Sequence, residues 1–357
     1  MSRFVPRFTQ VLPAVRVRFG PGVSRELAAE IQALGCKRAL VLSTPPQDDT
    51  ARTFSDMIGG LSAGVFTRAK MHTPIDVSEE ATAHAREVGA DCVVAVGGGS
   101  TTGLGKAIAY RTDLPQIVVP TTYAGSEATP ILGQTEGGRK TTLTDRKVQP
   151  EVILYDPELV ATLPAGMTVT SALNAMAHAA EGLYARDRGP LTTLMAIEGL
   201  TAFRDALPAV IRDPSDLDAR GETLYGAWLC GTVLGTVGMA LHHKLCHTLG
   251  GSFDLPHAET HSIVLPHAIA YNEPAAPGEL SVISDLFGEG APGEALHRFA
   301  AEMGAPTALK DLGLSEADLD RVTEIATQNP YWNPRPVEAR PLRALLQRAW
   351  EGAPPQP

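Results

Sequence analysis

The sequence predicts an α/β domain at the N-terminus followed by an all-helical domain. In residues 1–160 short apolar segments alternate with amphipathic helical patterns, and after about residue 160 only helical patterns remain. Alternating strands and helices indicate a parallel sheet wrapped by helices. The length of 357 residues also agrees with two domains, at roughly 100–200 residues per domain. We therefore expect an α/β domain over 1–160 and a helical domain over 161–357.

Five segments of the N-terminal half are predicted to be strands. Residues 15–19 alternate between apolar and polar and end at a Gly-Pro-Gly turn, 20–22. The other four are short apolar runs at 38–43, 92–96, 116–120 and 152–156. Helices are predicted between them at 24–35, with Ser24 as the N-cap, and at 78–89.

Long helical patterns fill the C-terminal half. They cover 172–185, 191–211 and 221–251, and the chain ends in a Gly- and Pro-rich stretch that we expect to be frayed. Strand patterns do not return after 152–156. The second domain is therefore expected to be all-helical.

The composition argues against several classes of protein. A formal net charge of −10 argues against nucleic-acid binding, which needs a basic face. No run of about 18 apolar residues predicts a membrane span, and the N-terminus lacks the apolar core of a signal peptide. The four cysteines form no CxxC pair and are typical of reduced thiols. We therefore expect a cytoplasmic protein with no nucleic-acid or membrane partner.

A glycine-rich turn follows the predicted strand 92–96. Residues 97–100, Gly-Gly-Gly-Ser, lead directly into a helical stretch. Glycines let the backbone approach a pyrophosphate, and the amides and dipole of a helix N-terminus attract its charge. The pattern is neither GxGxxG nor a P-loop, because the third glycine and the Lys-Ser/Thr pair are missing. The turn indicates either a phosphate site or a tight connection without a ligand.

A second polar loop follows the predicted strand 116–120. It contains Thr121, Thr122, Tyr123, Ser126 and Glu127. Ligands of parallel α/β sheets bind at the carboxyl ends of the strands, so this loop is expected to line the same crevice as the glycine turn. The alternative is an ordinary polar surface loop.

Six of the ten histidines fall between positions 242 and 267. His243 and His247 are four residues apart in a predicted helix and share a face, as do Asn174 and His178 in an earlier helix. His257 follows in a predicted loop. Paired side chains from two helices are how helical bundles build metal sites, but the neutral amide of Asn174 is a poor ligand for iron or zinc.

Three interpretations of the histidines stay open at this point: a working metal site, scattered structural histidines, or a metal-free catalytic cluster. The missing anionic ligand favours the third. In that interpretation imidazoles donate protons and attract anions, which suits histidine because its pKa lies near neutrality.

The order of these motifs resembles that of the iron-containing alcohol dehydrogenase family. The match covers most of the chain, and the combination is highly specific. It rests on residues 97–100, Pro120-Thr121-Thr122, Ser126-Glu127, 156–159, and the spaced His243, His247, Gly250, Pro256-His257, Leu265-Pro266-His267 and Tyr271-Asn272. The resemblance implies the dehydroquinate synthase-like fold of that family, with a dinucleotide-binding α/β domain, an all-helical catalytic domain, and NADH or NADPH as hydride donor.

Four features resemble one branch of this family, which acts in aromatic-compound degradation. Asn174 stands where an aspartate usually opens the metal motif, and Gly103 where an aspartate usually follows the glycine turn. The threonine loop, 121–129, is shortened. Residues 329–336, Asn-Pro-Tyr-Trp-Asn-Pro-Arg-Pro, resemble that branch's C-terminal signature. The resemblance implies reduction of a carbon–carbon double bond in a small dicarboxylate, with no metal expected.

The resemblance also implies which residues act on the substrate. The family's metal positions map to Asn174, His178, His243 and His257, and a further active-site histidine maps to His247. His243 is the first choice for stabilising the oxyanion. Tyr123 is expected either to reach the substrate or to pack under the nicotinamide. Lys140, beside Arg139, and Arg335 are expected to bind substrate carboxylates, the alternative being solvated surface charge.

The cofactor contacts implied by the resemblance come from three loops. The family's adenosine-side aspartate aligns with Thr44, which would not repel a 2′-phosphate, so we expect both cofactors to be accepted. The full predicted set is Thr44, Gly97, Gly98, Gly99, Ser100, Thr101, Thr121, Thr122 and Ser126.

Two other functions stay open from the sequence. A metal-dependent alcohol dehydrogenase would use Asn174 as a ligand and respond to added Fe²⁺ or Zn²⁺. A non-catalytic protein would keep the dinucleotide fold without reducing any substrate. A homodimer is expected from the resemblance and from the exposed edge of strand 15–19.

Overall fold

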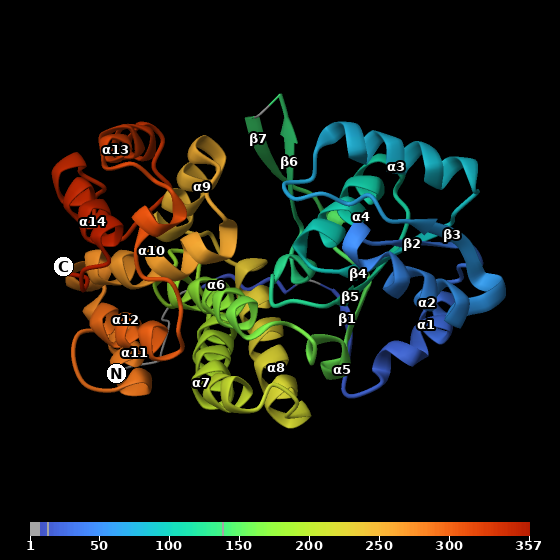
Figure 1. Ribbon diagram of the computed structural model, residues 1–357, viewed down its shortest axis with the longest axis horizontal. Helices are drawn as coiled ribbons and strands as arrows, with labels where there is room; N and C mark the ends of the chain where they lie inside the picture. Colours follow the sequence, from blue (N-terminus) through green and yellow to red (C-terminus); the bar gives the residue numbers. More distant parts are fainter. Residues whose placement is uncertain (1–7, 13, 138) are drawn as a thin grey trace. The chain divides into compact units, whose positions relative to one another are not determined.

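The chain folds into two compact units (Figure 1). The computed structural model describes residues 8–12, 14–137 and 139–357, and the side chains of all of these except 139 and 140. The α/β unit comprises 12–163 and 215–224, and the helical unit comprises the described residues up to 11, 164–214 and 225–357.

The predicted boundary at 160 therefore differs from the structure in two segments. Residues up to 11 group with the helical unit, and 215–224 group with the α/β unit. The second difference has a clear cause: the guanidinium of Arg220 donates to the carbonyl oxygens of Ala161 and Leu163, at 3.3 and 3.0 Å. A helical pattern does not reveal such contacts.

The α/β unit is built on a parallel sheet of six strands in the order β1-β8-β5-β4-β2-β3. All five predicted strands are confirmed, and β3 is additional. Its sequence, SAGVF, is only half-buried and contains a glycine, so it lacks the apolar run of the others. The strands are β1 (Arg16–Phe19), β2 (Ala39–Leu42), β3 (Ser62–Phe66), β4 (Cys92–Gly97), β5 (Gln116–Pro120) and β8 (Val152–Tyr155).

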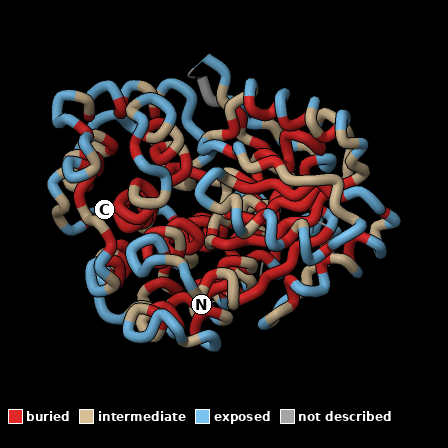
Figure 2. The backbone as a smooth tube through the Cα atoms, turned by 45° about the vertical axis from the view of Figure 1, so that its right-hand side comes forward, coloured by how far each residue is buried: buried red, intermediate tan, exposed pale blue. Residues whose placement is uncertain are grey.

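Helices cover both faces of this sheet. One face packs on α1 (Leu27–Ala33) and α2 (Asp48–Ile58), and the other on α3 (Ile75–Glu87) and α4 (Gly99–Thr112). The strands between them form a buried layer in Figure 2. Burial on both faces is the reason why these strands are continuous apolar runs.

One local prediction for the α/β unit was wrong, and one hairpin was not predicted. Ser24 does not cap a helix; its hydroxyl instead donates to Oδ2 of Asp156 at 2.6 Å, which ties the turn after β1 to the end of β8. The antiparallel hairpin of β6 (Ile131–Glu136) and β7 (Arg139–Thr144) was not predicted. Its β7 strand, RKTTLT, is polar and therefore has no apolar run.

The second unit is helical, as predicted. One predicted helix, 221–251, is in fact two, because the segment from Gly235 to Ala240 interrupts it. The helices are α6 (Ala165–Tyr184), α7 (Pro190–Arg212), α8 (Leu217–Leu234), α9 (Leu241–Phe253), α10 (His257–Asn272), α11 (Pro277–Phe287), α12 (Pro292–Glu302), α13 (Leu319–Gln328) and α14 (Ala339–Glu351); the first half of α8 and the short α5 (Pro157–Val160) belong to the α/β unit.

The helix α6 lies at the centre of the helical unit. All of its residues from Ala172 to Tyr184 are buried, and it packs against α7 and α10. Polar side chains on α6 are therefore held away from solvent. This position explains why Asn174 and His178 are part of the interior rather than of the surface.

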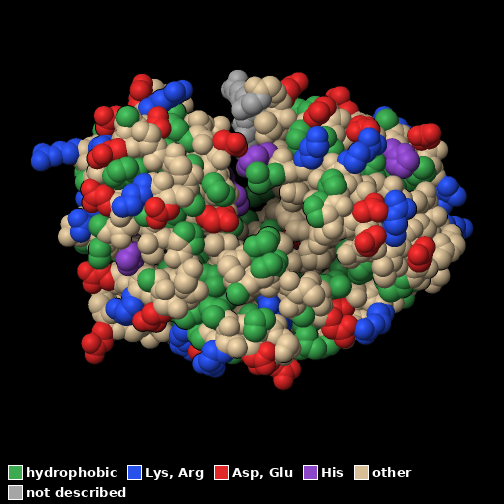
Figure 3. Space-filling model, viewed as in Figure 1, with side chains coloured by type: hydrophobic (Ala, Val, Ile, Leu, Met, Phe, Trp, Pro, Cys, Tyr) green, Lys and Arg blue, Asp and Glu red, His purple; other side chains and the backbone are tan. Residues whose placement is uncertain are grey.

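Charged side chains of both signs lie on the molecular surface. On the face shown in Figure 3, acidic and basic side chains are interspersed and form no continuous basic surface. In the part of the chain that the structure describes, none of the helices has the length and apolar character needed to cross a membrane.

Candidate active site

The glycine turn connects the end of β4 to the start of α4. Gly97 has a φ of 154°, and a Cβ built on it would lie 2.4 Å from Oγ1 of Thr101. A Cβ on Gly98 would lie 3.0 Å from Oγ1 of Thr122. Because side chains do not fit here, the backbone stays open to the close approach of a phosphate.

Three strands bring their carboxyl ends to this turn. The amide of Thr121, just after β5, donates to the carbonyl oxygen of Gly97 at 3.1 Å. The side chain of Gln47, after β2, donates to Oγ1 of Thr121 at 3.2 Å, and Oγ1 of Thr44 lies 3.4 Å from Oε1 of Gln47. The structure thus brings the predicted cofactor residues of three loops to one edge of the sheet.

Two buried hydroxyl groups at this edge make no hydrogen bond to the described residues. They are Oγ1 of Thr101 and Oγ of Ser126, and the latter lies 4.0 Å from a Cβ built on Gly99. Ser100, which is half-buried, follows in the first turn of α4. Buried polar groups nearly always have a partner, so these hydroxyls fit the phosphate oxygens of a dinucleotide.

A buried lysine holds the loop after β5 against α4. The Nζ atom of Lys106 donates to the carbonyl oxygens of Thr129 and Ile131, at 2.6 and 2.8 Å, and to Oγ1 of Thr129 at 2.9 Å. Burial lowers the pKa of Lys106 to about 7, against the opposite effect of the nearby Glu127 carboxylate. Lys106 therefore fixes the loop that carries Ser126.

Tyr123 does not lie where the prediction of a substrate contact requires. Its side chain is fully buried in the α/β unit, and its hydroxyl lies 2.9 Å from Oγ1 of Thr223. Burial raises the pKa of this hydroxyl. We therefore assign Tyr123 to the packing of the unit rather than to the reaction.

The predicted catalytic residues of the helical unit come from three helices. Asn174 and His178 lie on α6, His243 and His247 on α9, and His257 begins α10. The first three are buried, His247 is half-buried and His257 is exposed. The ring centroids of His178 and His243 are 5.2 Å apart, and those of His243 and His247 are 6.0 Å apart. The structure thus brings the α6 and α9 side chains into one cluster.

A buried carboxylate that the sequence analysis did not single out supports His243. Glu181 on α6 is fully buried, and its Oε2 accepts from Nδ1 of His243 at 2.7 Å. The same carboxylate accepts from the amides of Ala240 and His242, both at 2.8 Å, and from the hydroxyl of Tyr184 at 3.2 Å. A carboxylate can only accept, so the proton that His243 shares with it lies on Nδ1.

The C-terminal segment 329–336 completes the surroundings of α9. The hydroxyl of Tyr331 lies 3.0 Å from Nδ1 of His247. The side chain of Asn333 accepts from the amide of Leu241, the first residue of α9, at 3.3 Å. This segment therefore holds both the start of α9 and one of its histidines.

The two residues predicted to bind substrate carboxylates, Lys140 and Arg335, lie in different parts of the chain, and only the side chain of Arg335 is described. The Nη1 atom of Arg335 donates to the carbonyl oxygen of Tyr271 at 2.9 Å, and its guanidinium lies 4.3 Å from the centroid of that ring. Lys140 lies in β7, and its side chain is outside the described residues. Both assignments stay predictions.

Five buried atoms of the histidine cluster have no hydrogen-bond partner among the described residues: Oδ1 of Asn174, Nδ1 of His178, Nδ1 of His242, Nε2 of His243 and Nε2 of His261. Burial, with a smaller effect of neighbouring histidines, lowers the pKa values of His178, His242 and His261 well below the ordinary value. Such atoms are available to the donor and acceptor groups of a polar ligand.

These atoms do not form an ordinary site for a divalent cation. Among the described residues, three or more His, Cys, Asp or Glu ligand atoms lie within 4.8 Å of one another at two places, neither of which includes His178, His243 or His257. Zinc sites in proteins use at least three such ligands. The remaining family position, Asn174, offers a neutral amide oxygen. The residues present therefore do not fit the metal of this fold.

Comparison with known families identifies the family of this chain. Residues 14–157 match the model of iron-containing alcohol dehydrogenase, and 168–350 match that of the C-terminal part of the Fe-containing alcohol dehydrogenase family. The chain belongs to the iron-containing alcohol dehydrogenase family. The predicted fold class is thereby confirmed, the protein is an oxidoreductase, and a nicotinamide cofactor is supported in general terms.

Within the family, the chain is similar to several maleylacetate reductases, as the sequence motifs predicted. It is 60% identical to the maleylacetate reductase of Rhizobium sp. (strain MTP-10005), over 98% of this chain and 99% of the relative. It is 52% identical to that of Sphingobium indicum, over 95% and 96%. The crystal structure of the Agrobacterium tumefaciens maleylacetate reductase superimposes with a TM-score of 0.96 at 58% identity, covering 98% of this chain and all of that one.

Sequence reasoning missed Glu181, His242 and His261. A signal for Glu181 was present, because it follows His178 by three residues and Asn174 by seven and so lies on the same helix face. His242 and His261 were part of the histidine-rich run but had no spacing that pointed to a role. Their hydrogen bond links α9 to α10, a pairing that helical periodicity does not reveal.

Proposed function

We propose that this protein reduces the carbon–carbon double bond of maleylacetate to give 3-oxoadipate, with NADH or NADPH as donor and without a metal. The observation that carries this proposal is the cluster of His178 and His243 beside the neutral Asn174, with Glu181 behind His243. The names of the similar proteins support the choice of substrate.

The reaction needs one hydride and one proton. A reduced nicotinamide dinucleotide, bound at the glycine turn, supplies the hydride. Addition of the hydride to the carbon β to the ketone places the negative charge on the ketone oxygen as an enolate. Protonation of the α-carbon then gives the saturated product. The chain must therefore stabilise an oxyanion and deliver a proton.

His243 suits both tasks. Glu181 accepts from Nδ1 of His243, so the ring turns its other nitrogen, Nε2, away from the carboxylate, and Nε2 has no partner among the described residues. A second proton on Nε2 gives an imidazolium whose charge the Glu181 carboxylate balances. In this form Nε2 donates to the enolate oxygen and can pass its proton to the α-carbon.

The remaining polar atoms suit a dicarboxylate. The unpartnered nitrogen of His178 and the half-buried His247 lie next to His243, and His257 lies at the start of α10. Neutral imidazoles donate to carboxylate oxygens without requiring a buried net charge. We retain Lys140 and Arg335 as proposed contacts of the second carboxylate, although Arg335 already has one N–H bound to Tyr271.

The donor set supports the proposed metal independence. A cation held by the family positions would need a carboxylate at 174 and imidazole nitrogens within one coordination sphere. This chain offers the Asn174 amide, and its three histidine positions are not grouped within the distance that a shared ion requires. Imidazole hydrogen bonds therefore replace the Lewis acid at the enolate oxygen.

We also propose that both nicotinamide cofactors are accepted and that the protein is a cytoplasmic homodimer. Thr44 follows β2 and carries no charge to repel a 2′-phosphate.

The proposed cytoplasmic location and dimer have other support. All four cysteines are free and buried, as expected for a reducing compartment. β1 is an edge strand of the six-stranded sheet and offers an unpaired side for a second copy.

A direct assay tests this function. Purified wild-type protein should oxidise NADH or NADPH only with maleylacetate and release 3-oxoadipate. His243→Gln should reduce turnover about 100- to 1000-fold, the usual effect of losing an oxyanion donor, while NADH affinity is unchanged. His84→Gln, at a partly exposed position of α3, serves as control. Absence of cofactor oxidation by wild-type protein with maleylacetate would refute the proposal.

A further inference from the structure

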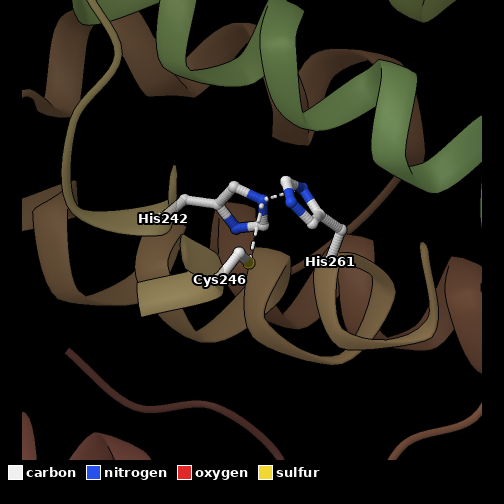
Figure 4. A group of neighbouring side chains, drawn as sticks. All are labelled: His242, Cys246 and His261. Atoms are coloured by element: carbon white, nitrogen blue, oxygen red, sulfur yellow. Dashed lines mark hydrogen bonds between the residues drawn. The ribbon is translucent and has the colours of Figure 1, made fainter. Parts of the chain in front are cut away.

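A second group of buried side chains lies next to the catalytic histidines. His242 and Cys246 extend from α9, and His261 extends from α10 (Figure 4). Nε2 of His242 lies 2.9 Å from Nδ1 of His261 and 3.7 Å from Sγ of Cys246. All three side chains are buried, and none of them belongs to the set inferred from the family.

The spacing of these three donors would admit a soft cation, but their surroundings do not favour one. Metal-bound imidazoles almost always donate their second N–H to a carboxylate, carbonyl or water. Here the outer nitrogens, Nδ1 of His242 and Nε2 of His261, have no partner among the described residues. A direct hydrogen bond between the two rings is the simpler account of the 2.9 Å distance.

That hydrogen bond restricts the two rings to two arrangements. Either His242 donates from Nε2 and His261 then carries its proton on Nε2, or His261 donates from Nδ1 and His242 then carries its proton on Nδ1. Among the described residues, the second arrangement leaves the Nδ1–H of His242 without an acceptor, and the first leaves the Nε2–H of His261 without one. A ligand that supplies an acceptor beside His261 therefore favours the first arrangement, which gives His261 a donor at Nε2.

The Nε2 donor of His261 belongs to a ring that lies close to His243 and His257. Its ring centroid lies 5.2 Å from that of His243 and 4.2 Å from that of His257. A maleylacetate dianion has only acceptor oxygens at its two ends. A buried N–H beside His243 and His257 therefore matches a carboxylate oxygen of the substrate.

We propose that His261 is a further substrate-binding residue, whose Nε2–H donates to a substrate carboxylate, and that His242 is the positioning residue that fixes this tautomer. The proposal rests on the proposed function, because the ligand is the substrate of that reaction. Cys246 packs against His242 and does not contact the ligand.

Steady-state kinetics on the full chain separate binding from structure. His261→Leu should raise KM for maleylacetate about 10- to 100-fold, the usual effect of losing a hydrogen bond to a charged group, and leave kcat and NADH affinity within about threefold. The matched control is His267→Leu, which removes a buried histidine from the same helix outside the cluster. Unchanged KM in a folded, NADH-binding His261→Leu protein would overturn the proposal.

A second pair of variants tests His242. His242→Gln keeps an N–H that can donate to Nδ1 of His261 and should retain a KM close to that of wild type, whereas His242→Met should raise KM as His261→Leu does. Equal KM values in the two variants would contradict the positioning role. Thermal unfolding of each variant separates this effect from a general loss of packing.

Nitrogen NMR of ¹⁵N-histidine-labelled wild-type protein with bound 3-oxoadipate gives an independent readout. The proposal predicts a neutral His261 with its proton on Nε2. A proton on Nδ1 instead, or stoichiometric binding of Zn²⁺ that Cys246→Ala abolishes, would overturn it. If wild-type protein does not reduce maleylacetate at all, the proposed function fails, and a second spectrum recorded without ligand still reports the tautomer of His261.

Discussion

Oε2 of Glu181 lies 2.7 Å from Nδ1 of His243, with both side chains buried inside the helical unit. The carboxylate joins α6 to the first turn of α9, because it also accepts from the amides of Ala240 and His242. One side chain thus orients His243, fixes its tautomer and satisfies a helix N-terminus. With the neutral Asn174 on the same helix, this carboxylate supplies the negative charge beside the His243 imidazole.

Replacing that carboxylate should affect both catalysis and folding. Glu181→Gln keeps the volume but loses the charge and turns two of the four acceptor contacts into donor–donor contacts. We expect kcat with maleylacetate to fall about 10²- to 10³-fold, by analogy with the loss of other electrostatic stabilisers. The free energy of unfolding should fall by about 2–4 kcal/mol. Stopped-flow kinetics and urea titrations measure the two effects.

Tyr184→Phe is the control for that prediction. It removes a neighbouring hydroxyl from the same carboxylate but leaves the contact with His243. Its kcat should stay within about threefold of wild type, with a stability loss of about 1 kcal/mol. Equal kcat losses in Glu181→Gln and Tyr184→Phe would show that kcat depends on the hydrogen bonds around Glu181 and not on its negative charge beside His243.

The glycine turn gives a prediction for cofactor binding. Gly97→Ala places a Cβ 2.4 Å from Oγ1 of Thr101 at a φ that L-residues rarely adopt. The turn must shift, so NADH affinity should fall at least about 10-fold, with a strain of about 1–3 kcal/mol. Fluorescence titration with NADH measures the affinity. Gly60→Ala, in open space, should bind NADH normally; normal binding by Gly97→Ala would remove this turn from the cofactor site.

Thr44 gives a prediction for cofactor choice. Thr44→Asp introduces a carboxylate after β2, where it would repel a 2′-phosphate and bind the ribose hydroxyls of NADH instead. We expect kcat/KM with NADPH to fall about 10- to 100-fold, and that with NADH to change by less than about threefold. Thr44→Asn, which adds no charge, should leave both values near wild type. Equal losses for the two cofactors in Thr44→Asp would place the adenosine ribose elsewhere.

His267 on α10 gives a prediction for stability against pH. Burial, with smaller effects of His297 and Arg348, lowers the pKa of His267 to about 3. In the unfolded chain the same group titrates near pH 6.5, so below that pH the unfolded state binds more protons. The free energy of unfolding therefore falls as the pH falls from about 6.5 towards 3.

The variant His267→Leu isolates this contribution. Between pH 7 and pH 5 its free energy of unfolding should fall by about 2 kcal/mol less than that of wild type, because one linked proton is lost. Urea unfolding of both proteins at the two pH values measures the difference. Parallel pH dependences would show that His267 is not held neutral by burial.

Much of the fold could be predicted because its core is simple. β2, β4, β5 and β8 are buried on both faces and therefore appear as apolar runs, and long amphipathic patterns mark α6 and α7. The β6–β7 hairpin was not predicted because its strands, ILGQTE and RKTTLT, contain no long apolar run. The break between α8 and α9 was not predicted because the apolar pattern continues through Val237 and Ala240.

Only the site residues that belong to local sequence patterns could be predicted. Glycine spacing and i,i+4 pairs identified the turn at Gly97 and the pairs on α6 and α9, since both are local patterns. Glu181 and the contact of His242 with His261 depend on how α6, α9 and α10 pack, which no local pattern records. Tyr123 was expected to reach the substrate or to pack under the nicotinamide because it lies in a polar loop, but its side chain is fully buried.

We propose that imidazoles, and not a cation, stabilise the enolate oxygen. The most direct test is turnover of maleylacetate by wild-type protein after exhaustive treatment with a chelator, with iron and zinc measured on the same sample. We expect full activity with far less than one metal per chain, and no gain from added Fe²⁺ or Zn²⁺. Loss of activity on chelation and its return with either ion would contradict it.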